Sequence, residues 1–301
     1  MSEISDIIDE VNRGSGTDMP FDRKAYADRM RIRREETYRM ADEAATRVAK
    51  QQPFYEKYLE IQGRFPELSA GNALLVTLQR PDATEINDAD GWKEYGIRIS
   101  RGEKGFVILE PSGEYIDRDG NRRNSFTVKK VFDISQTNAE KKQIRPSQDM
   151  KTLLKTIIMA CPVAVMLKKE MPHDLNALYD AQERIISVKS SISADNAFGC
   201  IAEEFAHVLL DCHGRTREET DFTARSAAYS LCLQYGENPA AIPLSDFSSE
   251  FAGKTPKEIR FELYGIKRVI SELERRMELC LNPPEIQEPV KEASVEKSEE
   301  R

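Results

Sequence analysis

The sequence has few of the residues that redox and metal sites use. It contains three histidines and five cysteines, and no two cysteines form a Cys-x-x-Cys pair. An odd number of scattered cysteines, most of them in apolar helical surroundings, favours reduced thiols over structural disulfides. No apolar run approaches the roughly 18 residues that a membrane-spanning helix needs, and the acidic start does not resemble a secretion signal. We therefore expect a cytoplasmic protein with no membrane partner.

Positive charge is also in short supply. Lysine and arginine number 44 against 52 aspartates and glutamates, and the formal net charge is −8. Such a chain has no overall attraction for nucleic acids, so any binding of DNA requires a local basic surface. Part of the acidity lies in residues 282–301, where proline and glutamate dominate, and we predict a disordered tail there. The polar residues 1–20 are predicted to be a flexible lead-in.

The residue pattern divides the rest of the chain into two α+β domains. The first is predicted over residues 21–140 and the second over 152–236. The segment 141–151 between them is polar and contains a proline, which is typical of a linker. A helical extension over 237–281 follows the second domain. The predicted fold class is therefore α+β, with two small domains and a C-terminal helix.

The first domain is predicted to begin with helices and to end with strands. A helical pattern covers 21 to about 58, with no internal Gly or Pro until Pro53. Another helix follows, capped near Ser69 and stopped by Pro81. A strand is predicted at 106–109 and a hairpin at 115–131, because apolar residues there alternate around an Asp-Gly-Asn turn.

The second domain has the helix–strands–helix–helix layout of small zincin-like domains. Its predicted elements are a helix at 150–161, strands at 163–167, 178–180 and 184–188, and helices at 198–212 and 221–235. In the extension, Thr255 and Pro256 suit the first turn of a helix over 257–281. Apolar residues recur along that helix every three or four positions, which predicts packing on the domain, with a dimer contact as the alternative.

The helix predicted at 198–212 carries Glu203, Glu204 and His207. Zinc peptidases place His-Glu-x-x-His on such a helix, because side chains at i and i+4 share one face and the Glu between them polarises a metal-bound water. Here Glu203 stands where the first His is expected. A carboxylate can also bind zinc, so the pair Glu203 and His207 remains a geometrically sound half of a metal site.

Three interpretations of this motif compete. In an active zinc hydrolase, Glu203 and His207 bind the metal, Asp221 or His213 supplies the third ligand, and Glu204 is the catalytic base. In the second interpretation the residues bind a metal without catalysis. In the third the fold persists and the chemistry is lost, so that no cofactor is expected and zinc is only an alternative.

A local excess of positive charge lies in the first domain. Residues 93–130 contain nine Lys or Arg and six Asp or Glu, a net of +3. Proteins that bind single strands combine a positive groove with aromatic side chains on which bases stack. Arg98, Arg101 and Lys104 could hold phosphates. Stacking platforms could come from five aromatic residues: Trp92, Tyr95, Phe106, Tyr115 and Phe126. Without DNA binding, Trp92 would be a core residue and 101–105 an ordinary charged turn.

A second basic stretch, 29–34, indicates either a solvated helix face or a contact to a nucleic-acid backbone.

The first domain resembles the N-terminal domain of ArdC-type antirestriction proteins, which also occurs in LtrC-like proteins of conjugative elements. The resemblance covers roughly residues 20–140. Its motifs are Ser69, Asn72, Leu75, Gln79 and Pro81, then Trp92 and Gly96, then Arg101-Gly-Glu-Lys-Gly105 and Pro111, and finally Val131-Phe-Asp133 with Gln136-Thr137. The resemblance implies binding of single-stranded DNA. We predict that contacts come from Asn72, Gln79, Arg80, Trp92, Arg98, Arg101 and Lys104.

The second domain resembles ImmA/IrrE-type peptidase domains and the C-terminal region of ArdC. The matching segments are Tyr179-Asp180, 185–188 and 202–210. In that resemblance the next helix supplies an acidic third ligand, and Arg225 stands at that position here. We predict that Arg225 forms an ion pair with Glu203 where the metal would lie. The prediction is thus a single-stranded DNA-binding, antirestriction-type protein of a conjugative or integrative element with a degenerate peptidase domain. The alternatives are an active zinc peptidase and a non-enzymatic scaffold.

Overall fold

The computed structural model describes residues 22–117, 119–139, 148–211, 215–244 and 247–283, and the fold is α+β as predicted. The predicted lead-in, most of the predicted linker and nearly all of the predicted tail lie outside these ranges. No helix among the described residues is long and apolar enough to cross a membrane.

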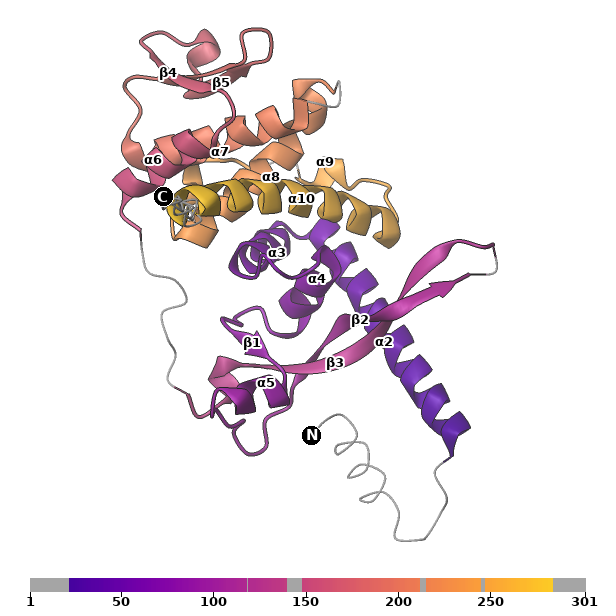
Figure 1. Cartoon of the computed structure of the whole chain (residues 1–301). Helices are drawn as coiled ribbons and strands as arrows, with labels where there is room; N and C mark the ends of the chain where they lie inside the picture. Colours follow the sequence, from indigo (N-terminus) through magenta and orange to yellow (C-terminus); the bar gives the residue numbers. More distant parts are fainter. Residues whose placement is uncertain (1–21, 118, 140–147, 212–214, 245–246, 284–301) are drawn as a thin grey trace, which may run out of the picture.

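The N-terminal half combines helices with a three-stranded antiparallel sheet of order β1-β3-β2 (Figure 1). Its elements are α2 Arg23–Lys50, α3 Gln52–Arg64, α4 Ala70–Gln79, β1 Ile86–Asn87, α5 Ala89–Glu94, β2 Phe106–Ile116, β3 Arg122–Asp133 and the 3-10 turn η1 Ile134–Gln136.

The helical pattern predicted over 21–58 forms two helices, α2 and α3, which separate just before Pro53. Gln51 lies between them with an extended backbone, at φ −133° and ψ 101°. Pro53 explains the break: proline is tolerated in the first turn of a helix but not in its interior, where it lacks the N–H that the previous turn needs. The capped helix before Pro81 is confirmed, since the Ser69 side chain accepts a hydrogen bond from the backbone N–H of Asn72.

Strands β2 and β3 form one long hairpin, where the sequence pattern indicated a short strand followed by a separate hairpin. Their pairing runs from Phe106 opposite Val131 to Ile116 opposite Arg122, with a register shift between Pro111 and Gly113. The base of the hairpin is half-buried, and the outer part of β2 is exposed on both faces. Figure 1 shows this ribbon projecting beyond α2.

The C-terminal half places a small sheet of order β4-β6-β5 against the helix that carries the metal motif. Its elements are α6 Met150–Ala160, β4 Ala164–Lys168, η2 Pro172–Asp174, β5 Ala177–Asp180, β6 Ile185–Lys189, α7 Ala194–Asp211, α8 Arg217–Tyr235, η3 Pro239–Ala241, α9 Phe247–Glu250 and α10 Pro256–Leu281. Strand β6 pairs parallel to β4 and antiparallel to β5. Because α6 begins at Met150, the last two residues of the predicted linker are helical.

The C-terminal helix α10 is confirmed as an amphipathic helix packed on the rest of the protein. Thr255 caps it and Pro256 opens it, as expected. Its buried face contacts α2, α6, α7 and α8, so it joins elements from both halves of the chain. The buried residues are Ile259, Leu263, Ile266, Val269, Ile270, Leu273 and Met277.

Helices α3 and α8 connect the two halves through close backbone contact. The Tyr55 hydroxyl lies 2.6 Å from Ser226 Oγ, and the Ser230 hydroxyl donates to the carbonyl of Leu59 at 2.9 Å. Gly63 has no side chain at the point of closest approach: a Cβ there would lie 2.5 Å from the Ser230 carbonyl oxygen. A single hydrophobic core therefore continues across the predicted boundary between the domains.

We expect Gly63→Ala to lower the free energy of unfolding by about 1–3 kcal/mol, because the added methyl group meets fixed backbone of α8. Gly265→Ala is the matched control. It lies within α10 with nothing within 4 Å of its added Cβ, so it should raise stability by up to about 1 kcal/mol. Urea unfolding of both variants measures the difference. Equal effects would show that α3 and α8 can separate without cost.

Candidate functional site

Helix α7 places the three motif residues at its buried face. Residues 197–210 include an almost continuous apolar run, so the helix lies between the small sheet and α8. Glu204 and His207 are buried, and Glu203 is partly buried. Helix α8 begins after Thr216, whose side chain and that of Glu219 form a reciprocal cap. This start brings the first two turns of α8 over the motif.

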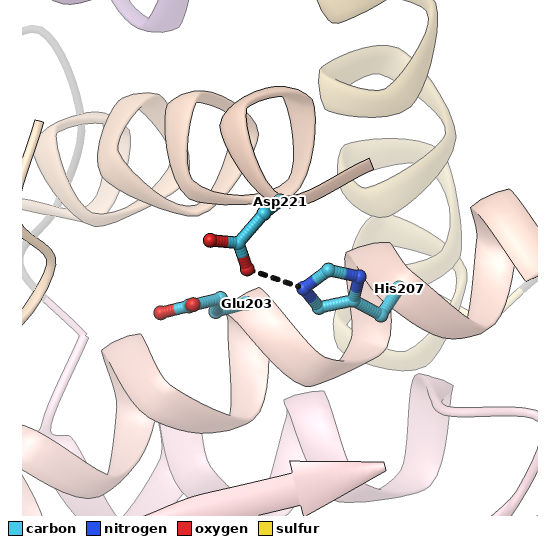
Figure 2. Close-up of side chains that lie close together, drawn as sticks. All are labelled: Glu203, His207 and Asp221. Atoms are coloured by element: carbon cyan, nitrogen blue, oxygen red, sulfur yellow. Dashed lines mark ion pairs between the residues drawn. The ribbon is translucent and has the colours of Figure 1, made fainter. Parts of the chain in front are cut away.

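The third residue of the cluster is Asp221, from the second turn of α8. One ligand atom each of Glu203, His207 and Asp221 lies within 4.8 Å of the other two (Figure 2). The structure thus brings together the three residues predicted as metal ligands. His213, the other candidate for the third position, lies outside the described residues.

The ring of His207 is oriented by Thr220. Its Nδ1 lies 3.1 Å from Thr220 Oγ1, and that hydroxyl also lies within hydrogen-bond distance of the carbonyls of Thr216 and Arg217. Because the single hydroxyl hydrogen is directed to a carbonyl, Oγ1 accepts from Nδ1–H. In the neutral ring the other nitrogen, Nε2, carries the lone pair. It is buried without a hydrogen-bond partner, and Asp221 Oδ1 lies 3.4 Å away.

Two acceptor atoms that face each other in a buried site are stabilised by a proton or a metal cation between them. One imidazole nitrogen and two carboxylates are a ligand set that Zn²⁺ and Mn²⁺ accept. The unpartnered Nε2 of His207 and the spacing of the three side chains are therefore compatible with a divalent metal ion at Glu203, His207 and Asp221.

Arg225 is already beside these carboxylates. Its Nη2 lies 2.5 Å from Asp221 Oδ2, and its Nε lies 3.4 Å from Glu203 Oε1. The guanidinium thus contacts the residue with which the sequence analysis paired it, and also Asp221. The positive charge of Arg225 therefore offsets part of the negative charge of Glu203 and Asp221, which a bound metal would also offset.

The two carboxylates respond differently to their surroundings. Burial raises the pKa of Glu203, the charge of Glu204 adds to the increase, and Arg225 only partly opposes it. Burial also acts to raise the pKa of Asp221, but the nearby imidazole of His207 and the charge of Arg225 outweigh it, so this pKa lies below its ordinary value. Asp221 is therefore the firmly ionised member of the cluster.

Glu204, the predicted catalytic base, is held by Arg217. The guanidinium donates from Nη1 to Oε2 at 2.8 Å and from Nη2 to Oε1 at 2.7 Å. The backbone N–H of Tyr179 in β5 donates to Oε2 at 2.7 Å. Burial opposes the charge of Arg217, but this bidentate pair outweighs it and raises the pKa of Arg217. Both oxygens of Glu204 thus have partners that a proton-accepting base would have to release.

Sequence reasoning did not identify Arg217 or Thr220. A signal for the first was present: Arg217 is the first residue of α8, where the helix dipole favours acidic residues. An arginine at this end indicates a nearby acidic partner. The Thr216-x-x-Glu219 spacing also places the helix start at this residue.

Two residues predicted to contact DNA, Asn72 and Gln79, bind the backbone of β2, and their contact with DNA stays a prediction. The Asn72 amide exchanges two hydrogen bonds of 2.9 Å with the backbone of Leu109. The Gln79 amide does the same with Val107, at 2.9 and 3.0 Å. The two amides, two turns apart on α4, thus satisfy the edge of β2 and fix the base of the hairpin.

Trp92 is in the core, the alternative that the sequence left open. Its ring is 1% exposed and its Nε1–H donates to the carbonyl of Phe132 at 3.0 Å. Arg80 contacts the Ser135 hydroxyl at 3.0 Å. These contacts belong to the protein's own structure and leave DNA binding by Trp92 and Arg80 a prediction only.

The remaining basic candidates, Arg98, Arg101 and Lys104, are exposed. Of the five possible stacking platforms, Tyr95 and Tyr115 are exposed, at 74% and 53%. The others are not: Phe106 and Trp92 are buried, and Phe126 is partly buried.

The fold occurs in a solved antirestriction protein. The Mn(II)-bound crystal structure of ArdC from the R388 plasmid matches with a TM-score of 0.51 and 16% identity, over 81% of this chain and 96% of that one. The metal-free ArdC structure matches with a TM-score of 0.46 and 17% identity, over 70% and 83%. No protein-family profile and no curated protein sequence matches the chain. At these identities the likeness shows a shared fold alone.

We expect Arg217→Ala to lower the free energy of unfolding by about 2–3 kcal/mol, because it leaves the buried carboxylate of Glu204 without its counter-charge. Arg275→Ala is the control, since Arg275 makes the same bidentate contact to Glu272 on the exposed side of α10. That loss should be much smaller, because solvent screens the exposed pair. Chemical denaturation measures both, and similar losses would contradict a structural role for the buried pair.

Proposed function

We propose that the protein is a single-stranded DNA-binding protein of the antirestriction type, acting in the cytoplasm of cells that carry a conjugative or integrative element. The observation that carries the proposal is the exposed basic loop at the base of the hairpin. Arg98, Arg101 and Lys104 project from it, and within the described ranges no acidic side chain pairs with them. The shared fold with ArdC, which its structure describes as an antirestriction protein, supports the same proposal.

The backbone of this loop is held rigidly while its basic side chains stay exposed. The backbone N–H of Arg98 donates to Asn138 Oδ1 at 2.7 Å, and the carbonyl of Arg98 accepts from the backbone N–H of Asn138 at 2.9 Å. The Gln136 amide donates to the carbonyl of Lys104 at 3.0 Å. The same amide donates to the Glu103 carboxylate at 2.8 Å, so the acidic side chain of the loop is bound to Gln136. Cations in fixed positions lose little freedom when they meet phosphates.

Exposed aromatic side chains accompany these cations. Tyr95 follows α5 close in sequence to the loop, and Tyr115 stands on the projecting hairpin near Arg122 and Arg123. A base can stack on either ring while the arginines hold the backbone. This combination suits single strands, whose bases are available for stacking, better than duplex DNA.

In this proposal the C-terminal half is not a peptidase. Glu204 is engaged by Arg217 and Tyr179, and Arg225 lies on the carboxylates of the cluster. A water held near Glu203, His207 and Asp221 would find no free base. The residues around the motif therefore stabilise the fold of α7 and α8.

We expect Arg101→Glu with Lys104→Glu to weaken the binding of a labelled oligo(dT) at least about tenfold at low salt. If each residue contacts one phosphate, the dependence of log K on log salt should fall by about 1.4. Fluorescence anisotropy at several salt concentrations measures both quantities.

The control has the same change of charge elsewhere. Lys151→Glu with Lys155→Glu alters exposed residues of α6, in the other half of the protein, and should leave the affinity nearly unchanged. Equal losses in the two double variants would indicate non-specific attraction. No binding by the wild type at low salt would refute the proposal.

A second candidate function is the binding of a divalent cation by Glu203, His207 and Asp221. The unpartnered Nε2 of His207 favours it. When bound, such an ion would neutralise the two carboxylates and take the lone pair of His207. Arg225 competes for the same carboxylates, so we propose that the wild type binds weakly.

We expect Arg225→Ala to tighten Mn²⁺ binding at least about tenfold, equivalent to about 1.4 kcal/mol, because it removes the competing positive charge. His207→Ala should abolish the binding, and Arg276→Ala on α10 is a control that should not change it. Titration calorimetry and the electron paramagnetic resonance of free Mn²⁺ report binding without any activity assay. If Arg225→Ala does not bind Mn²⁺, the cluster is structural only.

The peptidase and scaffold alternatives make different predictions. An active zinc peptidase requires stoichiometric zinc in the purified protein and a loss of cleavage in Glu204→Gln at unchanged melting temperature. A scaffold requires that the wild type binds neither single-stranded DNA nor a divalent metal.

A further inference from the structure

The exposed face of α10 carries two aromatic side chains between two cations. Lys257, Phe261, Tyr264 and Arg268 follow at intervals of four, three and four residues, so they lie along one face of the helix. Phe261 is 75% exposed and Tyr264 is 54% exposed. At about 1.5 Å per residue, this α10 stripe is about 16 Å long.

The stripe has no evident role in folding. The opposite face of α10 supplies the core contacts, and Gly265, next to Tyr264 of the stripe, has only open space around an added Cβ. In the described part of the chain, neither Lys257 nor Arg268 pairs with an acidic side chain. Residues 254–270 contain five Lys or Arg and two Glu, a net of +3 in a chain whose net charge is −8.

Helix α2 connects the stripe to the hairpin. Arg260, one turn from Tyr264, forms an ion pair with Asp42 of α2. Tyr38 lies one turn before Asp42 and is partly exposed, and Arg34 lies one turn before Tyr38. Arg34 in turn contacts the carbonyl of Phe126 in β3 at 3.5 Å. A row of side chains on α2 therefore runs from the hairpin to the α10 stripe, and Figure 1 shows α10 lying across the C-terminal end of α2.

We infer that the α10 stripe is an additional binding segment for single-stranded DNA, reached from the hairpin across α2. Bases stack on Phe261 and Tyr264, and phosphates contact Lys257 and Arg268. The inference rests on the proposed function and extends it to the C-terminal helix. Charge decides the occupant: two exposed aromatic rings between unpaired cations complement a polyanion with flat bases, whereas a partner helix would need a broader apolar surface.

The inference predicts that the stripe matters only for strands long enough to reach it. We would compare an oligo(dT) of about 30 nucleotides with one of about 8. Phe261→Ala with Tyr264→Ala should weaken binding of the long strand at least about fivefold, as expected when roughly 1 kcal/mol of stacking is lost. Binding of the short strand should remain within about twofold. Lys257→Glu with Arg268→Glu should lower the salt dependence for the long strand only.

Leu279→Ala is the matched control, because Leu279 is another exposed apolar residue of α10, at 48%, outside the stripe. It should change neither affinity. If the wild type binds and Arg101→Glu with Lys104→Glu weakens both strands while the stripe variants change nothing, the inference is wrong and the proposed function stands. If the wild type binds no strand, both are wrong. If the stripe variants instead turn a dimer into a monomer in sedimentation at unchanged affinity, the stripe is an interface between copies.

Discussion

The neutralisation of buried carboxylates between α7 and α8 is the constraint on which the C-terminal half depends. Glu203 and Glu204 are adjacent on a helix whose face is otherwise apolar, and Asp221 comes over them from α8. Such charges cannot remain unpaired away from water. Arg217 balances Glu204 with two short hydrogen bonds, and Arg225 bridges Asp221 and Glu203. Both arginines lie on the first turns of α8, so the packing of α7 on α8 and the balance of charge require each other.

The same balance decides what the motif can do. Arg217 occupies the carboxylate that a hydrolase would use as its base, which argues against catalysis. Arg225 only shares the other two carboxylates, and His207 keeps one nitrogen without a hydrogen-bond partner. We therefore propose that the cluster binds a cation more readily than it supports catalysis. The cluster keeps the geometry of a metal site, and the charge that a metal would supply comes largely from the protein itself.

In the N-terminal half, amide and indole side chains hold the backbone in place, while charged side chains are exposed to solvent. The amides of Asn72 and Gln79 and the indole of Trp92 satisfy backbone groups of the hairpin and its base. The charged side chains nearby stay exposed. This division suits the proposed binding of DNA, because the amides hold the strand in place and the cations stand at fixed positions beside it.

The fold class, several helix limits and the candidate ligands Glu203 and His207, with Asp221 or His213 as the third, could be predicted from the sequence alone. Caps, prolines and apolar spacing act locally, and the i, i+4 relation of Glu203 and His207 needs only a helix. Only the tertiary structure decided that Arg217 reaches Glu204, that Asn72 binds a strand and that one core spans both halves. These contacts join residues that are distant in sequence or on different elements. Which residues meet in these contacts depends on how the helices and strands pack, and a local sequence pattern does not contain that information.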